Sequence, residues 1–62
     1  MTIYGVRVLE ALVQPRTLAE LVGLTGFGVR YVIRGIGEAR TEGHVIVAMG
    51  VKVGQTIYRR LD

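Results

Sequence analysis

The chain has 62 residues, half of them apolar, no cysteine and a formal net charge of +3 at neutral pH. A chain of this length forms one small domain, and its apolar content excludes a largely disordered protein. The lack of cysteine excludes disulfides and thiolate chemistry, and a single histidine, His44, is too few for a zinc site. We therefore expect one domain over residues 1–62, without a metal or cofactor.

The first residues lack a basic leader followed by an apolar segment, and no apolar run reaches the roughly 18 residues that span a bilayer. The sequence thus predicts a cytoplasmic protein with no membrane partner. Eight Lys and Arg residues against five Asp and Glu residues leave a modest basic excess. Such an excess favours a polyanionic partner only where it gathers on one surface, so the placement of the cations decides the function.

A first helix is predicted over residues 2–13, because apolar residues recur there at helical spacing. The stripe comprises Leu9, Leu12 and Val13 with either Val6 or Val8. Gly5 and the β-branched residues near the start also fit an extended segment. Pro15 has no amide hydrogen and disfavours helical dihedrals in the residue before it, so we expect the helix to end just before Pro15.

A second helix is predicted over residues 17–23. Thr17 and Glu20 have the capping-box spacing, in which the hydroxyl and the carboxylate each accept a backbone amide of the other residue. Ala19 is small enough for another helix to cross close by, and Gly23 stands where a tight turn would require positive φ. We therefore expect the chain to turn at Gly23.

A third helix is predicted over residues 25–42, with Thr25 as its N-cap and Gly43 at its end. Gly35 and Gly37 each cost about 1 kcal/mol relative to alanine inside a helix. We therefore expect this helix either to bend or to end early and resume. One side of it carries the residues expected in the core, which are Val29, Val32, Ile33 and Ile36.

A β-hairpin is predicted over residues 44–61, where the apolar period changes to two. Val45, Val47 and Met49 share one face of its first strand, and Ile57 and Leu61 share one face of its second strand. We expect these faces to close over the helices, with Lys52 at the hairpin tip. The predicted fold class is therefore α+β, with three helices followed by a two-stranded hairpin.

The side of the third helix opposite the core carries Phe27, Arg30, Tyr31 and Arg34, spaced i, i+3, i+4 and i+7. The major groove of B-form DNA admits one α-helix, and an arginine fork can donate to both O6 and N7 of guanine. Arg30 and Arg34 are therefore the candidates for reading bases, and Tyr31 for a phosphate or sugar contact. The same residues also fit an ordinary solvated face, and Phe27 could instead fold under the hairpin or enter a dimer contact.

Two further groups could contact a nucleic acid backbone. The amides of Gly26, Phe27 and Gly28 precede the third helix and could hold a phosphate oxygen. On the hairpin, positive charge that could reach the backbone or the minor groove lies at Lys52, Arg59 and Arg60.

Catalytic chemistry finds no support in the sequence. Glu10, Glu20, Glu38 and Glu42 fall on helix faces expected to be solvated, and capping explains Glu20. No pair of these carboxylates has a basic or nucleophilic partner nearby for catalysis. For His44 we expect a structural hydrogen bond rather than a pH-sensing role. The sequence predicts a protein that is not an enzyme.

The segments LAELVGLTGFGVRYVI and EGHVIVAMGVKVGQTIYRRL together resemble the winged helix-turn-helix family of bacterial, archaeal and phage DNA-binding regulators. This resemblance implies that the third helix is the recognition helix, and that the hairpin is the wing. Together with the arguments above it gives the predicted DNA-binding set, which is Thr25, Gly26, Phe27, Arg30, Tyr31, Arg34, Lys52, Arg59 and Arg60.

Two functions remain open at this point. The first is a small transcriptional regulator, repressor-like or architectural, that binds double-stranded DNA as a homodimer through its apolar first helix and has no small-molecule effector. The second is a protein interaction module that binds a polymerase subunit or a host factor through Phe27, Tyr31 and the hairpin.

Overall fold

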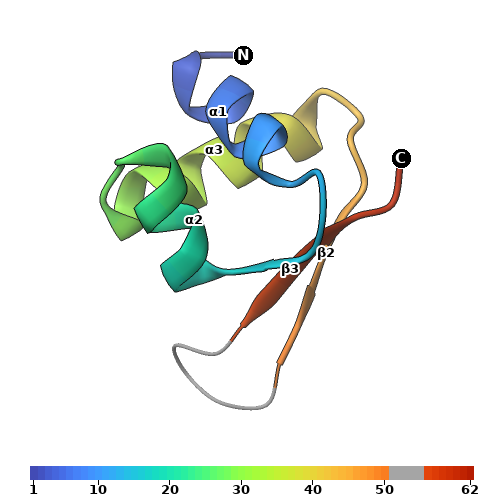
Figure 1. Ribbon diagram of the computed structural model, residues 1–62. Helices are drawn as coiled ribbons and strands as arrows, with labels where there is room; N and C mark the ends of the chain where they lie inside the picture. Colours follow the sequence, from blue (N-terminus) through green and yellow to red (C-terminus); the bar gives the residue numbers. More distant parts are fainter. Residues whose placement is uncertain (51–55) are drawn as a thin grey trace.

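Three helices and a small antiparallel sheet make up the computed structural model, which describes residues 1–50 and 56–62 (Figure 1). Lys52 lies outside the described residues. The α+β class is confirmed, but the sheet has three strands rather than the predicted two. The elements in chain order are α1 (Ile3–Ala11), β1 (Arg16–Thr17), α2 (Leu18–Thr25), α3 (Val29–Thr41), β2 (Ile46–Met49) and β3 (Ile57–Arg60).

The third strand comes from the connection between α1 and α2. Arg16 pairs with Tyr58 and Thr17 with Ile57, so β1 adds to the free side of β3 and the strand order is β1-β3-β2. In Figure 1 the strands lie below the helices, and the chain returns from α3 into β2. The sequence did not predict β1, because its two residues are too few to show the alternating pattern of a strand.

The first helix is shorter than predicted. Thr2 is its N-cap, and its hydroxyl accepts the amide of Tyr4 at 3.3 Å. The helix ends at Ala11, whose carbonyl oxygen accepts the Arg16 guanidinium at 3.2 Å. Val8, not Val6, belongs to the buried stripe, and Val13 is 81% exposed because it lies beyond the helix end. None of the helices in the described chain is long and apolar enough to cross a bilayer.

The start of α2 follows the prediction and its end does not. The Glu20 amide donates to the Thr17 hydroxyl at 3.1 Å, and the Thr17 amide donates to the Glu20 carboxylate at 2.8 Å, which confirms the capping box. Gly23 lies inside the helix, and the turn occurs at Gly26, which has φ +76°. Thr25 is the last residue of α2 instead of the N-cap of α3, and its hydroxyl donates to the Leu21 carbonyl at 2.6 Å.

The third helix is continuous through both of its glycines. Gly35 is buried where α1 crosses α3, and a Cβ built on it would stand 2.5 Å from the carbonyl oxygen of Tyr4. The close helix crossing is therefore at Gly35, and the expectation for Ala19 is wrong because Ala19 is exposed. Gly43, with φ +98°, follows the last turn and confirms the predicted end of the helix.

The core is small and lies between the three helices and the inner face of the sheet. Leu9, Phe27 and Tyr58 are partly buried against it. The hairpin contributes Ile46, although the sequence analysis expected Val45, Val47 and Met49 to face inward. The buried apolar residues are Val8, Leu12, Leu21, Val32, Ile36, Ala39 and Ile46.

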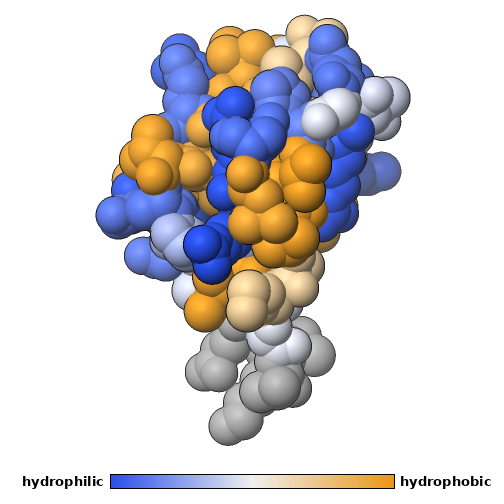
Figure 2. Space-filling view, turned by 90° about the vertical axis from the view of Figure 1, so that its right-hand side faces the viewer, coloured by the Kyte–Doolittle hydropathy of each residue, from blue (hydrophilic) through white to orange (hydrophobic). Residues whose placement is uncertain are grey.

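The outer face of the sheet is apolar and largely exposed, with Val47 half-buried. Val47 pairs with Arg59 and Met49 with Ile57, so the apolar residues share one face as predicted, but that face points away from the core. Figure 2, a view from the right-hand side of Figure 1, shows an apolar area near the middle of this side of the molecule, with separate apolar areas at its top and left. We call this surface the outer sheet face, and its apolar members are Val45, Val47, Met49, Ile57 and Leu61.

One side of β2 has no neighbouring strand within the described chain. The Leu61 amide donates to the Val45 carbonyl at 2.8 Å, so the next carbonyl along, that of Ile46, turns away from β3. The Arg40 guanidinium donates to this Ile46 oxygen through Nε at 3.0 Å and through a terminal nitrogen at 2.8 Å. A side chain of α3 thus occupies part of the open strand edge.

Candidate nucleic-acid interface

The outward side of α3 is set by the residues that the helix buries. Val32, Gly35, Ile36 and Ala39 face the core. At about 100° per residue, the residues on the opposite side are an exposed set that we call the α3 outer face. Its members are Arg30, Ile33, Arg34, Gly37 and Thr41.

Two apolar residues of α3 lie further out than the sequence predicted. Val29 is 49% exposed and Ile33 is 51% exposed, although both were expected in the core. The buried side of α3 is rotated toward Gly35 and Ala39 relative to the prediction, because α1 packs against Gly35. Ile33 therefore lies beside Arg30 on the α3 outer face.

An aromatic cluster joins α1 to the beginning of α3. The Tyr4 ring meets Phe27 edge-on, with centroids 4.9 Å apart and an interplanar angle of 74°. It stacks on Tyr31, also at 4.9 Å and with an angle of 21°. Phe27 is partly buried against the core, so the prediction that it projects outward beside the arginines is wrong, whereas Tyr31 remains 43% exposed.

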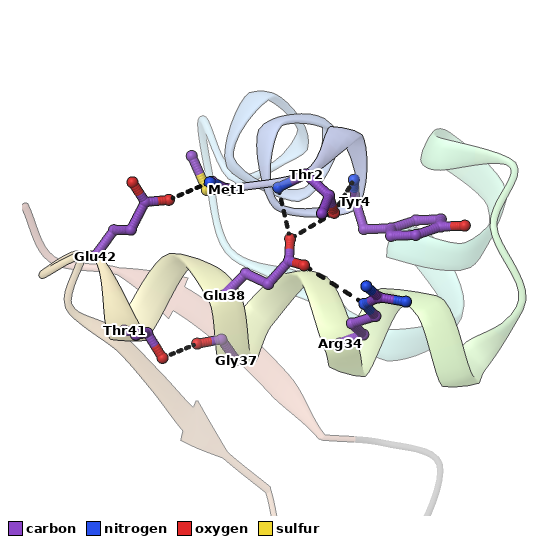
Figure 3. A network of polar contacts seen from close by, with 8 residues as sticks. All are labelled: Met1, Thr2, Tyr4, Arg34, Gly37, Glu38, Thr41 and Glu42. Carbon is purple, nitrogen blue, oxygen red and sulfur yellow. Dashed lines mark hydrogen bonds and ion pairs between the residues drawn. The ribbon is translucent and has the colours of Figure 1, made fainter.

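Arg34 is held in place by the start of α1 and by its own helix. Its guanidinium lies 5.2 Å from the centroid of the Tyr4 ring, and its Nε is 3.4 Å from a Glu38 carboxylate oxygen. The other Glu38 oxygen accepts the Thr2 hydroxyl at 2.6 Å and the Thr2 amide at 3.1 Å. Figure 3 shows these side chains of α3 reaching toward Thr2 and Tyr4. The Arg34 side chain nevertheless remains 56% exposed.

These contacts favour the charged form of Glu38. The pKa of its carboxyl is lowered from the ordinary value of 4.5, chiefly because the Thr2 hydroxyl donates to it. Backbone amides and the Arg34 guanidinium lower the pKa further, against an opposing effect of desolvation. At neutral pH Glu38 is therefore an anion that orients Arg34.

Arg30 is the least constrained cation of α3. It is exposed, and within residues 1–50 and 56–62 no carboxylate lies within ion-pair distance of it. It lies one turn before Arg34 on the same helix face. The structure thus brings together the two arginines that the sequence singled out, one of them oriented and the other unpaired.

The amides before α3 are partly used within the protein. The Gly26 amide donates to the Val22 carbonyl at 3.0 Å, and the Phe27 amide donates to the Thr25 hydroxyl at 3.2 Å. The expectation that these two amides are free is therefore wrong. Gly28 is the N-cap, and within the described residues no side chain caps the helix. The Tyr31 amide donates to the Gly28 carbonyl at 3.0 Å, whereas the amides of Val29 and Arg30 lack an intrahelical acceptor.

The hairpin arginines point in different directions. Arg59 is exposed and lies on the outer sheet face, opposite Val47. Arg60 lies on the other face of β3 and its Nε donates to the Asp62 carboxylate at 3.1 Å. The structure therefore does not bring them together, and it leaves Arg60 engaged within the chain.

His44 has the structural hydrogen bond that we expected. Its Nδ1 is 2.7 Å from an Asp62 carboxylate oxygen. Desolvation acts to raise the pKa of Asp62, but hydrogen bonds from His44 and Arg60 outweigh it and lower the pKa from 3.8. These three residues close the end of the hairpin.

Sequence reasoning missed three residues around the candidate interface. The spacing of Arg34 and Glu38 is the i, i+4 spacing of a helical ion pair, and it could have identified Glu38. Tyr4 left no local signal, because its partners are on another helix. Gly37 was considered only as a weakness of the helix, although it is exposed at the centre of the α3 outer face.

Comparisons with models of known protein families, with curated proteins and with solved structures find no match to this chain. Among the described residues, no group of three His, Asp or Glu side chains is placed to hold a metal ion.

Proposed function

We propose that this chain is a winged helix protein that binds double-stranded DNA, and that it acts as a small transcriptional regulator of the repressor type. The observation that supports this most directly is the α3 outer face, where Arg30 is exposed and unpaired within the described chain, one turn from Arg34. A cation exposed without a partner on a helix face suits a polyanionic ligand.

The order of the elements supports the same proposal. Two helices, α2 and α3, follow each other across a short turn at Gly26, and an antiparallel pair of strands comes after them. This is the arrangement in which a second helix enters the major groove and the wing reaches the backbone or the minor groove.

The two arginines have different roles in this proposal. Arg34 is oriented before binding by Tyr4 and Glu38, which reduces the conformational entropy lost when its free nitrogens meet a base edge or a phosphate. Arg30 has no such restraint within the described residues and reaches out from the first turns of α3. We assign base contacts to both, and backbone contacts to the uncapped start of α3, to Arg59 and to Lys52.

The narrower contact set leaves out five predicted residues, which are Thr25, Gly26, Phe27, Tyr31 and Arg60. The Thr25 hydroxyl bonds within α2, the Gly26 amide bonds to Val22, and the Arg60 guanidinium bonds to Asp62. Phe27 and Tyr31 contribute by packing on Tyr4, which fixes the start of α3 against α1.

The test is duplex binding by the wild type and three arginine variants. We expect binding of a randomised duplex pool at low salt, with a log–log salt slope of about −4 if four or five cations neutralise phosphates. Arg30→Ala and Arg34→Ala should each weaken binding to the selected duplexes about tenfold or more. Arg7→Ala is the matched control, because Arg7 is an exposed arginine away from α3 that pairs with Glu10. Measured at a concentration at which sedimentation shows the same oligomeric state as the wild type, it should bind like the wild type. Absence of duplex binding by the wild type at low salt would refute the proposal.

We further propose that the protein binds DNA as a homodimer. The exposed apolar residues Ile3 and Val6, 52% and 40% exposed, support a contact through α1. Footprinting should then show paired half-sites about one helical turn apart. Val6→Glu should convert the dimer to a monomer in sedimentation, and a single protected half-site at every concentration would contradict the dimer.

One observation favours the second candidate, a protein interaction module. Met49 and Leu61 on the outer sheet face are 56% and 55% exposed, and apolar surface of this kind is typical of protein contacts. The Arg30→Ala, Arg34→Ala double variant separates the two functions. It abolishes duplex binding under the first proposal, whereas under the second the wild type itself binds no duplex.

A further inference from the structure

Gly37 has no role in the fold that requires a glycine. Its backbone is helical, and apart from its own helix a Cβ built on it would meet no atom of residues 1–50 and 56–62 within 4 Å. A glycine inside a helix is less favourable than alanine by on the order of 1 kcal/mol. Gly35, two residues earlier, has the opposite setting, because there a Cβ would collide with the Tyr4 carbonyl. The bare surface at Gly37 is therefore free to serve something outside the chain.

The neighbours of Gly37 form one continuous surface. Ile33 and Arg34 precede it by four and three residues, and Arg30 precedes it by seven, so all lie on the same side of the helix. Ile33 exposes half of its apolar side chain there. The α3 outer face thus combines the half-exposed, β-branched Ile33, two guanidinium groups and a single residue without a side chain, Gly37, whose carbonyl accepts the Thr41 hydroxyl at 2.9 Å.

We infer that this surface recognises a thymine next to a guanine in the major groove. The inference rests on the proposed DNA binding and adds the base chemistry to it. Ile33 packs on the C5-methyl group of the thymine, and Arg30 donates to O6 and N7 of the guanine. The bare backbone at Gly37 lets the helix lie deep in the groove.

The chemistry of the groove gives each residue its partner. The C5-methyl of thymine is the apolar group that base pairs present in the major groove, and it matches Ile33. The Ile33 side chain is short, so it reaches a base edge only if the helix axis comes close to the groove floor. A side chain at position 37 would hold the helix away, whereas glycine admits the approach.

Charge favours a nucleic acid over a protein on this surface. The carboxylate next to this surface is that of Glu38, which already accepts two hydrogen bonds from Thr2 and pairs with Arg34. Arg30 has no carboxylate partner in the described chain, so the net charge of the surface is positive. The phosphates of a nucleic acid repeat along its backbone, so they can neutralise the positive charge of this surface.

The first experiment removes only the methyl groups. Duplexes selected from a randomised pool are amplified once with thymidine triphosphate and once with deoxyuridine triphosphate. The wild type should bind the uracil duplexes about fourfold more weakly or worse, as expected when a methyl group leaves a buried contact. The Ile33→Ala variant should bind both preparations equally. The inference would be overturned if the wild type bound the thymine and uracil duplexes equally. It would also be overturned if Ile33→Ala lost as much affinity for the uracil duplexes as the wild type does.

The second experiment fills the bare surface. Gly37→Leu should melt at or above the wild-type temperature, because its side chain enters open space in a helix, yet bind the selected duplexes at least tenfold more weakly. Gly23→Leu is the matched control, since Gly23 is also helical with nothing within 4 Å of its Cβ position, but lies on α2. It should gain similar stability and keep its affinity. Wild-type affinity in Gly37→Leu would overturn the inference.

The two failures can be told apart. If the wild type binds selected duplexes but neither the methyl groups nor position 37 affects affinity, the base chemistry inferred here is wrong and DNA binding stands. If the wild type binds no duplex at low salt, DNA binding itself is refuted and the inference falls with it.

Discussion

The carbonyl oxygen of Tyr4 lies where the side chain of a larger residue at Gly35 would begin. A Cβ built on Gly35 would be 2.5 Å from that oxygen and 2.9 Å from a methyl carbon of Val8. The two helices therefore touch through backbone, and this contact fixes the position of α3 relative to α1.

Gly35→Ala should destabilise the protein by about 2 kcal/mol, because the helices must separate to admit the methyl group. Urea unfolding measures the loss. Gly37→Ala is the control, and it should gain up to about 1 kcal/mol because its methyl group meets no other atom. A Gly35→Ala variant as stable as the wild type would show that the crossing is not tight.

Thr17→Ala should cost about 1 kcal/mol of unfolding free energy, since it removes the N-cap of α2 and one half of the capping box. Thr41→Ala is a matched control, because the Thr41 hydroxyl donates to the Gly37 carbonyl within the last turn of α3. It should change stability by a few tenths of that amount. Equal losses in the two variants would exclude a special role for the cap.

The stability of the protein should fall in acid through Glu38. The folded-state pKa of Glu38 is lowered from 4.5, so its stabilising effect is fully present above about pH 4.5 and is lost as the pH falls through the lower folded value. Glu38→Gln should melt lower than the wild type at neutral pH and lose less stability on acidification. Melting curves from neutral to acidic pH measure both effects.

The control for this pH dependence is Glu10→Gln. Glu10 is an exposed residue whose carboxylate lies 3.8 Å from Arg7, a separation at which a surface ion pair contributes little. This variant should lose as much stability at acidic pH as the wild type does. If the melting temperatures of Glu38→Gln and Glu10→Gln depend on pH in the same way, the contacts with Thr2 do not stabilise the charged form of Glu38.

The aromatic cluster should be energetically coupled. Tyr4→Leu and Tyr31→Leu, alone and combined, form a double-mutant cycle for the stacked pair. We expect a coupling of about 0.5–1.5 kcal/mol in unfolding free energy, the range found for aromatic pairs. Losses that simply add would mean that the rings are neighbours without an interaction.

Local chemistry predicted the parts of the fold that depend on few residues. The hydroxyl and carboxylate of Thr17 and Glu20 satisfy each other within one turn, so their spacing was sufficient. Gly43 likewise marked the end of α3. The turn was misplaced at Gly23 because α2 and the segment after it contain several glycines, and of these Gly26 is the one with positive φ at the end of α2.

Long-range pairing decided what the sequence could not. A strand has two faces, and the apolar residues at Val45, Val47 and Met49 indicated the wrong one as the core face. Ile46 turns inward because the β2–β3 register places it on the same face as Tyr58, which packs against the helices. For the candidate site, the arginine spacing was predictable, but the contacts of Arg34 with Tyr4 depend on the crossing of α1 and α3.

The guanidinium of Arg40 on the Ile46 carbonyl has a consequence beyond the single molecule. An uncovered border strand is a template on which strands of other molecules can add, which leads to aggregates and fibrils. Here the Arg40 guanidinium occupies one acceptor on this border, the Ile46 carbonyl, and its positive charge repels further copies of a basic chain. The protein can therefore display an apolar sheet surface while its border resists polymerisation.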